Sequence, residues 1–183
     1  MALGAALWMG LSPAVQAAPV FVRTAALTLA GNSNLVTAAV DAAGTNAYFV
    51  NGTGTVTKVR LSDFTELSSL TVAGVTSVGA AAIDTGLNQL YFTAKVSGVV
   101  KLVRVNLGSF THAPGTDQLT LRSDAINVPT AFAVDATGHL GYVAAGKSSA
   151  SNPAEMIRVN LSTFAVSFRK NATFPDDLNT VAG

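Results

Sequence analysis

Residues 40–48 read Val-Asp-Ala-Ala-Gly-Thr-Asn-Ala-Tyr, and the fold is decided by the fact that this pattern repeats along the chain. An aspartate is followed seven residues later by a tyrosine three times, as Asp41 with Tyr48, Asp84 with Tyr91, and Asp135 with Tyr142. The three copies use all three tyrosines of the chain. Their aspartates lie 43 and then 51 residues apart, a period typical of proteins in which each repeat is one supersecondary unit.

A second stretch recurs further along each copy, where a cation and a valine precede a leucine and, three residues later, a phenylalanine. Its copies are Lys58-Val59-Arg60-Leu61 with Phe64, Arg104-Val105-Asn106-Leu107 with Phe110, and Arg158-Val159-Asn160-Leu161 with Phe164. Alternating apolar residues such as Val103, Val105 and Leu107 indicate a strand with one buried face. The sequence shows no sustained helical period, and β-branched residues dominate its apolar set.

Each copy predicts four short strands. The first ends at the aspartate, the second holds the tyrosine, the third holds the valine and leucine, and the fourth resembles residues 67–72. Gly44, Gly86 and Gly138 follow the first strand, where a tight hairpin needs a residue that tolerates positive φ. Four strands per repeat is the size of one β-propeller blade. We therefore predict an all-β propeller with about three four-stranded blades, over residues 31–73, 74–122 and 123–172.

Both ends of the repeat region predict partial strands. Leu27 precedes Asp41 by the same fourteen residues that separate Leu70 from Asp84, so residues 21–30 are expected to form a lone outer strand. Residues 179–183 resemble the start of another first strand. Since propellers have about four to eight blades, we expect a fragment of a larger ring of about six to eight blades. The alternative is self-association of chains through open blade edges.

The composition excludes several classes of function. Charged residues make up 11% of the chain, against about 25% in ordinary globular proteins, and the net charge is +1. Nucleic-acid binding needs clustered Lys and Arg, so nucleic acid is not an expected partner. The absence of cysteine excludes disulfides and thiolate metal ligands. No apolar run reaches the length of about 18 residues that a membrane span requires.

The N-terminal residues predict export. Residues 1–17 carry no charge, residues 2–11 are apolar, and Ser12-Pro13 interrupts the apolar stretch. Val15 and Ala17 are small residues at the −3 and −1 positions of a cleavage site, so residues 1–17 are predicted to be a signal peptide. The predicted location is outside the cell, at the cell surface or in the periplasm. The alternative is a buried N-terminal helix.

One apparent nucleotide-binding motif is predicted to be accidental. Residues 141–148 fit the phosphate-loop pattern of glycine, four residues, glycine, lysine and serine. The repeat register places Tyr142-Val143-Ala144 in a strand, and Asn152-Pro153 would disrupt a following helix. We therefore predict no nucleotide and no other cofactor.

The repeated aspartates could be metal ligands, but an aspartate before a tight turn more often binds the backbone of that turn. We expect this role for Asp41, Asp84 and Asp135, together with a stack of contacts between them and the repeated cations Lys58, Arg104 and Arg158. His112 and His139 share no repeat spacing and are predicted to be solvated loop residues. No catalytic, cofactor-binding or metal-ligating residue is predicted.

Loop lengths vary on one side of the predicted blades. The connections between second and third strands lengthen from copy to copy, so we expect residues 95–99 and 147–155 to border a partner-facing surface. Simple solvated drift of these loops is the alternative.

The repeats resemble the YVTN-type propeller repeats of exported bacterial and archaeal proteins, relatives in fold of lactonase-like propellers. The resemblance rests on residues 40–44 followed by Tyr48-Phe49-Val50-Asn51, with weaker echoes at residues 91–94 and 142–145. It implies a propeller fold and a role at the cell surface or in the periplasm, and it brings no catalytic residue. Our leading hypothesis is a non-enzymatic scaffold that binds an unknown protein or glycan. The alternative is a lactonase- or lyase-type enzyme whose active site needs further blades.

Overall fold

The computed structural model describes residues 26–29, 34–123, 127–146 and 154–171, and every helix or strand in this part of the chain is a β-strand. The predicted signal peptide, residues 1–17, lies outside the described residues. Of the predicted lone strand at 21–30, only residues 26–29 are described, and they form no strand.

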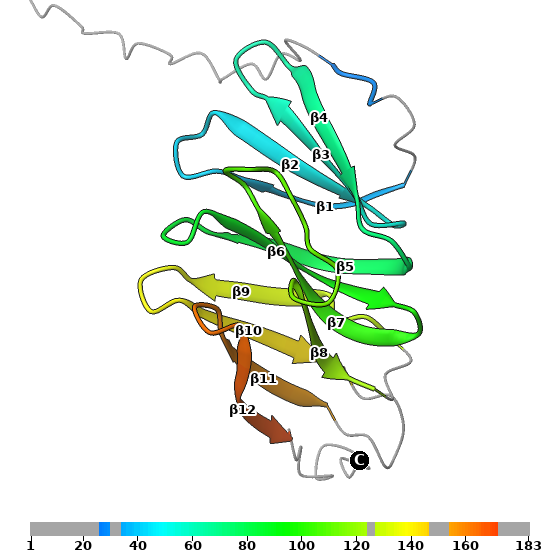
Figure 1. Cartoon of the computed structure of the whole chain (residues 1–183), viewed down its shortest axis with the longest axis vertical. Coiled ribbons are helices and arrows are strands. Elements are labelled where there is room, and N and C mark those ends of the chain that lie inside the picture. The colour runs from blue at the N-terminus through cyan, green and yellow to red at the C-terminus, as the bar shows by residue number, and fades with distance from the viewer. Residues whose placement is uncertain (1–25, 30–33, 124–126, 147–153, 172–183) are drawn as a thin grey trace, which may run out of the picture.

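The strands form three antiparallel sheets of four, each a meander in chain order (Figure 1). We call these sheets blades 1, 2 and 3, and the predicted all-β propeller fold with three four-stranded blades is confirmed. Blade 1 consists of β1 (Leu35–Val40), β2 (Asn46–Asn51), β3 (Thr55–Arg60) and β4 (Thr65–Thr71). Blade 2 consists of β5 (Val75–Asp84), β6 (Gln89–Val96), β7 (Val99–Asn106) and β8 (Gln118–Arg122). Blade 3 consists of β9 (Ala131–Asp135), β10 (Leu140–Ala145), β11 (Glu155–Asn160) and β12 (Ala165–Asn171).

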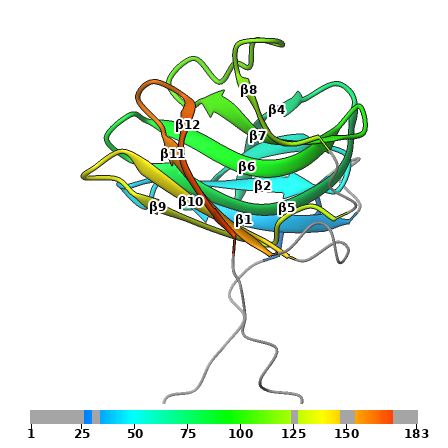
Figure 2. The same ribbon diagram turned by 90° about the horizontal axis from the view of Figure 1, so that it is seen from below.

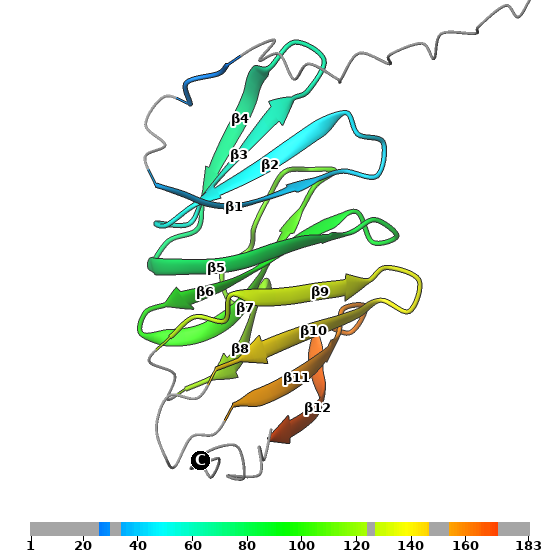
Figure 3. The same ribbon diagram turned by 180° about the vertical axis from the view of Figure 1, so that it is seen from behind.

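The first strands of the three blades, β1, β5 and β9, lie side by side (Figure 3). Seen from below, the blades overlap as successive layers (Figure 2). The backbone N–H of Ala81 in β5 donates to the Thr37 hydroxyl in β1 at 3.1 Å. The Thr93 hydroxyl in β6 donates to the carbonyl of Pro129 at 2.6 Å. Pro129 belongs to the link between blades 2 and 3 that leads to β9. A Cβ built at Gly79 would lie 2.0 Å from this carbonyl oxygen, so the close approach of the two blades needs glycine there.

Two apolar cores fill the spaces between neighbouring blades. The core between blades 1 and 2 contains the fully buried Val50, Val56 and Phe92, and the core between blades 2 and 3 contains the fully buried Leu102 and Ile157. Burial of each such side chain contributes about 1.5–3 kcal/mol. Blade 2 is therefore covered on both faces, whereas blades 1 and 3 each share one face with blade 2.

The repeated aspartates bind the backbone of the first turn in each blade, as predicted. Asp41 accepts from the backbone N–H groups of Thr45 at 2.8 Å and Asn46 at 3.1 Å. Asp84 accepts from the Leu87 N–H at 3.0 Å, and Asp135 accepts from two N–H groups of its own turn. Partial burial would raise the pKa of Asp41, but hydrogen bonds from Asn46 and Thr45 outweigh it and lower this pKa below its usual value.

The positive φ in these first turns falls on glycine only in blade 1. Gly44 has φ of +65°, whereas in blades 2 and 3 the left-handed residues are Asn88 and His139, at +52° and +51°. The prediction of a left-handed glycine was therefore wrong for Gly86 and Gly138. Asparagine and histidine are among the side chains that tolerate this conformation best. In blades 2 and 3 the left-handed conformation is therefore adopted by Asn88 and His139, which lie further along the turn than Gly86 and Gly138.

Candidate functional site

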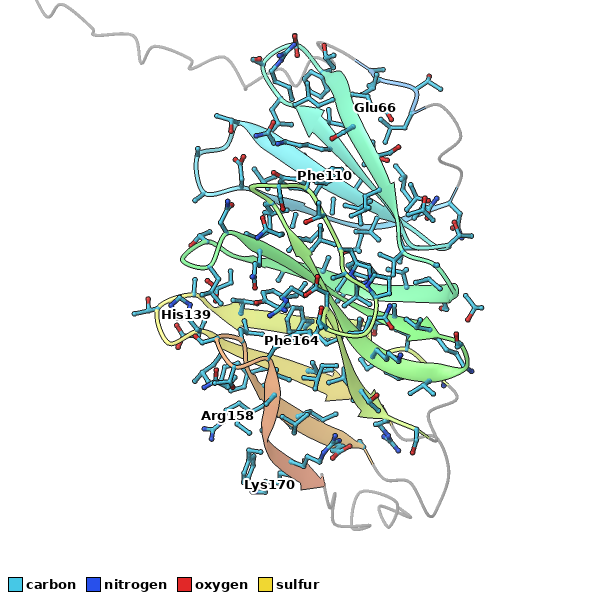
Figure 4. All side chains as sticks on the ribbon, in the orientation of Figure 1. Glu66, Phe110, His139, Arg158, Phe164 and Lys170 are labelled. Atoms are coloured by element: carbon cyan, nitrogen blue, oxygen red, sulfur yellow. The ribbon has the colours of Figure 1, made fainter. Side chains whose placement is uncertain are left out.

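The same aromatic contact joins each blade to the next. The ring of Tyr48 in blade 1 lies 6.2 Å from the ring of Phe110 in blade 2, centre to centre. The ring of Tyr91 in blade 2 lies 6.0 Å from that of Phe164 in blade 3. Figure 4 labels Phe110 and Phe164, which follow the third strand of their own blades. The sequence shows both residue types at fixed repeat positions, but a contact between one copy and the next leaves no local signal.

The phenylalanines occupy an unusual backbone conformation. Phe64, Phe110 and Phe164 have φ of 54°, 51° and 50°, in the left-handed region that bulky residues rarely adopt. Such a residue costs about 1–3 kcal/mol and persists where its surroundings hold it. An aromatic pair contributes about 0.5–1.5 kcal/mol beyond the area it buries. The tyrosine contacts thus offset part of the backbone cost at Phe110 and Phe164.

The repeated cations lie over aromatic rings. The Arg104 guanidinium is 4.4 Å from the centre of the Phe164 ring in the next blade, and the Lys58 ammonium is 5.9 Å from the centre of the Tyr48 ring. Arg158 instead lies 5.7 Å from the ring centre of Phe168 in its own blade. These distances lie within the range of cation–π attraction.

The predicted stack of aspartate–cation contacts was wrong. The aspartates bind turn N–H groups, whereas Arg104 pairs with Asp117 at 2.6 Å and Arg158 donates to the Ser167 hydroxyl at 3.1 Å. An aspartate at the end of a first strand is close to its own turn, and these nearby donors satisfy it first. Another cation, Arg60, pairs with Asp63 at 2.6 Å, and this hydrogen bond lowers the pKa of Asp63 to about 2.

Among the described residues, exposed large apolar side chains gather on the two open blade faces. A groove of about 430 Å³ on blade 1 is lined by Leu35, Phe49, Val59, Leu61 and Phe64, with residues 27–29 beside them. Phe64 is 42% exposed. On blade 3, Tyr142 is 37% exposed, and Met156 and Phe168 are each 49% exposed. Blade 2 has no exposed large apolar side chain in the described part of the chain, because both of its faces are covered.

Both histidines lie in turns or loops, as predicted, but they are half-buried and hydrogen-bonded, so the prediction that they are simply solvated was wrong. His139 in blade 3 has its Nδ1 2.9 Å from Oδ2 of Asp84 in blade 2, and the Asp84 side chain is completely buried. Nδ1 of His112 lies 3.0 Å from the Arg104 carbonyl oxygen, and its Nε2 lies 3.2 Å from the Gln118 amide. His139 and Asp84 are far apart in the sequence, which is why no local pattern revealed their contact.

Residues 141–145 of the phosphate-loop pattern lie in a strand, and Gly146 follows that strand. Residues 141–145 belong to β10 and pair with both β9 and β11, so their backbone N–H groups are in a sheet and not in a phosphate-binding loop. Lys147 and Ser148 lie outside the described residues. Among the described residues, no three His, Asp or Glu side chains gather closely enough to hold a metal ion.

The predicted partner loop at residues 95–99 is a tight hairpin. Ser97 and Gly98, at φ of 50° and 85°, form the turn between β6 and β7. Both strands have eight residues, against six in β2 and β3, so the extra residues of this copy lengthen strands and not a loop. In the second expected loop, 147–155, only residues 154 and 155 are described.

No family model matches the chain, and no curated protein matches it. Solved structures do. Kuenenia stuttgartiensis hydrazine synthase matches with a TM-score of 0.61 and 12% identity over 74% of this chain and 36% of that one. U3-55K matches with a TM-score of 0.58 and 12% identity over 75% and 39%. The WD40 repeats of RRP9 match with a TM-score of 0.53 and 14% identity over 73% and 36%.

These likenesses show the fold alone, a partial β-propeller similar to WD40-type structures. The chain spans between a third and two fifths of the length of the structures it matches. In the part of the chain that the structure describes, no helix is long and apolar enough to cross a membrane.

Proposed function

We propose that this chain is part of an exported, non-enzymatic β-propeller of the YVTN-type kind, which binds a protein or glycan through one face. The proposal rests on the observation that the repeated aspartates are engaged in structural hydrogen bonds. Asp41, Asp84 and Asp135 all bind turn N–H groups, and Asp84 also binds His139. The groups best suited to acid–base chemistry therefore stabilise the frame, and a stable frame is what a propeller uses to present loops.

The proposed binding surface is the end of the blades that holds the β2–β3 and β6–β7 turns and the links between blades. Backbone hydrogen bonds tie these parts together, from Val72 N–H to Gly54 at 3.0 Å and from Ser97 N–H to Gly74 at 2.9 Å. Exposed hydroxyl side chains line this end, namely those of Thr53, Thr76, Ser77 and Ser97. Hydroxyl groups both donate and accept hydrogen bonds, which suits the neutral, hydroxyl-rich surface of a glycan.

Binding is tested with the purified mature chain on a glycan array, followed by titration calorimetry with any glycan that binds. We expect the double variant Thr76→Ala/Ser77→Ala to lower affinity by about tenfold, the effect of losing roughly 1.4 kcal/mol. Ser62→Ala, at a turn on the opposite end, is the matched control and should bind like the wild type. Equal losses in both variants would contradict the assigned surface. Hydrolysis of a lactone by the chain would favour the enzyme alternative instead.

Export is tested separately by expressing residues 1–183 in a bacterium and sequencing the N-terminus of the product. We expect a mature chain that begins at Ala18 and is found outside the cytoplasm. An unprocessed chain that stays in the cytoplasm would contradict export without affecting the binding proposal.

A further inference from the structure

We propose that the open face of blade 3 in one copy of this chain binds the open face of blade 1 in a second copy, head to tail. Tyr142 of one copy would then contact Phe64 of the next, as Tyr48 contacts Phe110 and Tyr91 contacts Phe164 within the chain. This inference concerns the blade faces and is independent of the proposed binding of a protein or glycan by the loops.

The groove on blade 1 is built from the same repeat positions as the faces of blades 2 and 3 that the preceding blade covers. We call this surface of blade 1 the receiving face. Counted along the repeat, its residues Phe49, Val59, Leu61 and Phe64 occupy the positions of Phe92, Val105, Leu107 and Phe110 in blade 2. Those four residues of blade 2 all lie in the core that blade 1 covers. The corresponding residues of blade 3, Val143, Val159, Leu161 and Phe164, lie in the core that blade 2 covers. On blade 1 the same surface stays open beside residues 27–29.

The open face of blade 3 is built from the same repeat positions as the faces of blades 1 and 2 that pack against the following blade. We call this surface of blade 3 the inserting face. Tyr142 occupies the position of Tyr48 and Tyr91, which are 2% and 0% exposed. Met156 occupies the position of Val56 and Leu102, which are both completely buried. Tyr142 and Met156 are 37% and 49% exposed. Exposed apolar surface of this kind marks an interaction site, and the two interior joints show which surface fits it.

Charge also favours this pairing. Cross-strand partners in a sheet share a face, so Arg158, opposite Phe168, and Lys170, opposite Met156, belong to the inserting face. By the same rule Glu66, opposite Val59, belongs to the receiving face. Figure 4 shows Glu66 at one end of the molecule and Arg158 and Lys170 at the other. In a head-to-tail contact, unlike charges would meet, whereas two copies of the blade 3 face would bring like charges together.

The two surfaces differ from each other, so the contact is heterologous, and repeated contacts either close into a ring or continue as an open assembly. We test this with the purified chain by sedimentation velocity over a range of concentrations. The wild type should form dimers or larger species. Phe64→Glu and Tyr142→Glu should each block one face and raise the dissociation constant at least about tenfold. Thr120→Glu, on an exposed position of blade 2, is the control and should assemble like the wild type.

Mixing the two blocked variants separates this proposal from a symmetric contact. Each variant keeps one intact face, so an equimolar mixture of Phe64→Glu and Tyr142→Glu should form a dimer that neither forms alone. If either variant loses its far-ultraviolet circular dichroism spectrum, Leu35→Glu and Met156→Glu replace them, since both positions are exposed on the same faces. A folded wild type that remains monomeric at about 100 μM, well above the micromolar range of specific association, would overturn the proposal. So would a mixture that stays monomeric while the wild type assembles.

Discussion

The ring of Tyr91 packs on the ring of Phe164 in the following blade, with ring centres 6.0 Å apart, and the Arg104 guanidinium lies 4.4 Å from the centre of the same phenylalanine ring. The two aromatic residues thus form the contact, here called a joint, between one blade and the next. The equivalent contact of Tyr48 with Phe110 makes this joint a repeated unit of the structure.

Removing a buried tyrosine ring from a joint should destabilise the chain strongly. We expect Tyr91→Ala to lower the free energy of unfolding by about 3–5 kcal/mol, since large-to-small changes in a core lose apolar burial and leave a cavity. Tyr91→Phe keeps the ring and should cost much less. Urea denaturation followed by circular dichroism measures both. Equal losses for the two variants would show that the hydroxyl group, and not the ring, holds the joint.

The contact between His139 and Asp84 should couple blades 2 and 3 energetically. Because the Asp84 side chain is completely buried and bonded to Nδ1 of His139, each residue depends on the other. We expect a double-mutant cycle with Asp84→Ala and His139→Ala to give a coupling energy of about 0.5–3 kcal/mol. The same cycle between His139 and Asp41, in blade 1, serves as the control. Additive effects of Asp84→Ala and His139→Ala would contradict a direct contact.

The first turn of blade 1 should weaken in acid. The folded-state pKa of Asp41 lies below its unfolded value, so the stability it contributes is present above about pH 4 and is lost as the pH falls through the folded pKa. We expect Asp41→Ala to flatten the pH dependence of stability below about pH 4. Thermal unfolding from pH 2 to pH 7 measures this. An unchanged pH profile would contradict the role of the ionised carboxylate in the turn.

Two of the three tyrosines should resist ionisation in the folded chain. Burial, followed by the charge of Asp41, raises the pKa of Tyr48, and burial raises the pKa of Tyr91 above its usual range. The stability that these neutral phenols contribute is complete below about pH 10 and is lost as the pH rises further. Absorbance titration should therefore show a late phase that coincides with unfolding. Tyr48→Phe and Tyr91→Phe should each reduce that phase.

Much of the fold could be predicted because the residues that indicate it recur at regular intervals along the sequence. The spacing from Asp41 to Tyr48, repeated in two further copies, indicates four strands per repeat, and the structure has three four-stranded sheets. The turn role of the aspartates followed from local chemistry, since a side chain before a hairpin finds donors within a few residues.

Contacts between copies could not be predicted in the same way. His139 binds Asp84, and Arg104 lies over Phe164, in each case across a blade joint. Neither pair has a sequence spacing that any element of secondary structure would impose. The extra residues around 95–99 likewise could have formed a loop or longer strands, and pairing across β6 and β7 favoured the strands.

The central claim is that the repeated tyrosine of each blade packs on the repeated phenylalanine of the next. Nuclear Overhauser effects between selectively labelled tyrosine and phenylalanine rings test it most directly, because the chain has only three tyrosines. We predict cross-peaks from Tyr48 to Phe110 and from Tyr91 to Phe164, whose ring centres lie 6.2 and 6.0 Å apart. Cross-peaks from Tyr48 to Phe64 and from Tyr91 to Phe110, within single blades and without those joint contacts, would contradict it.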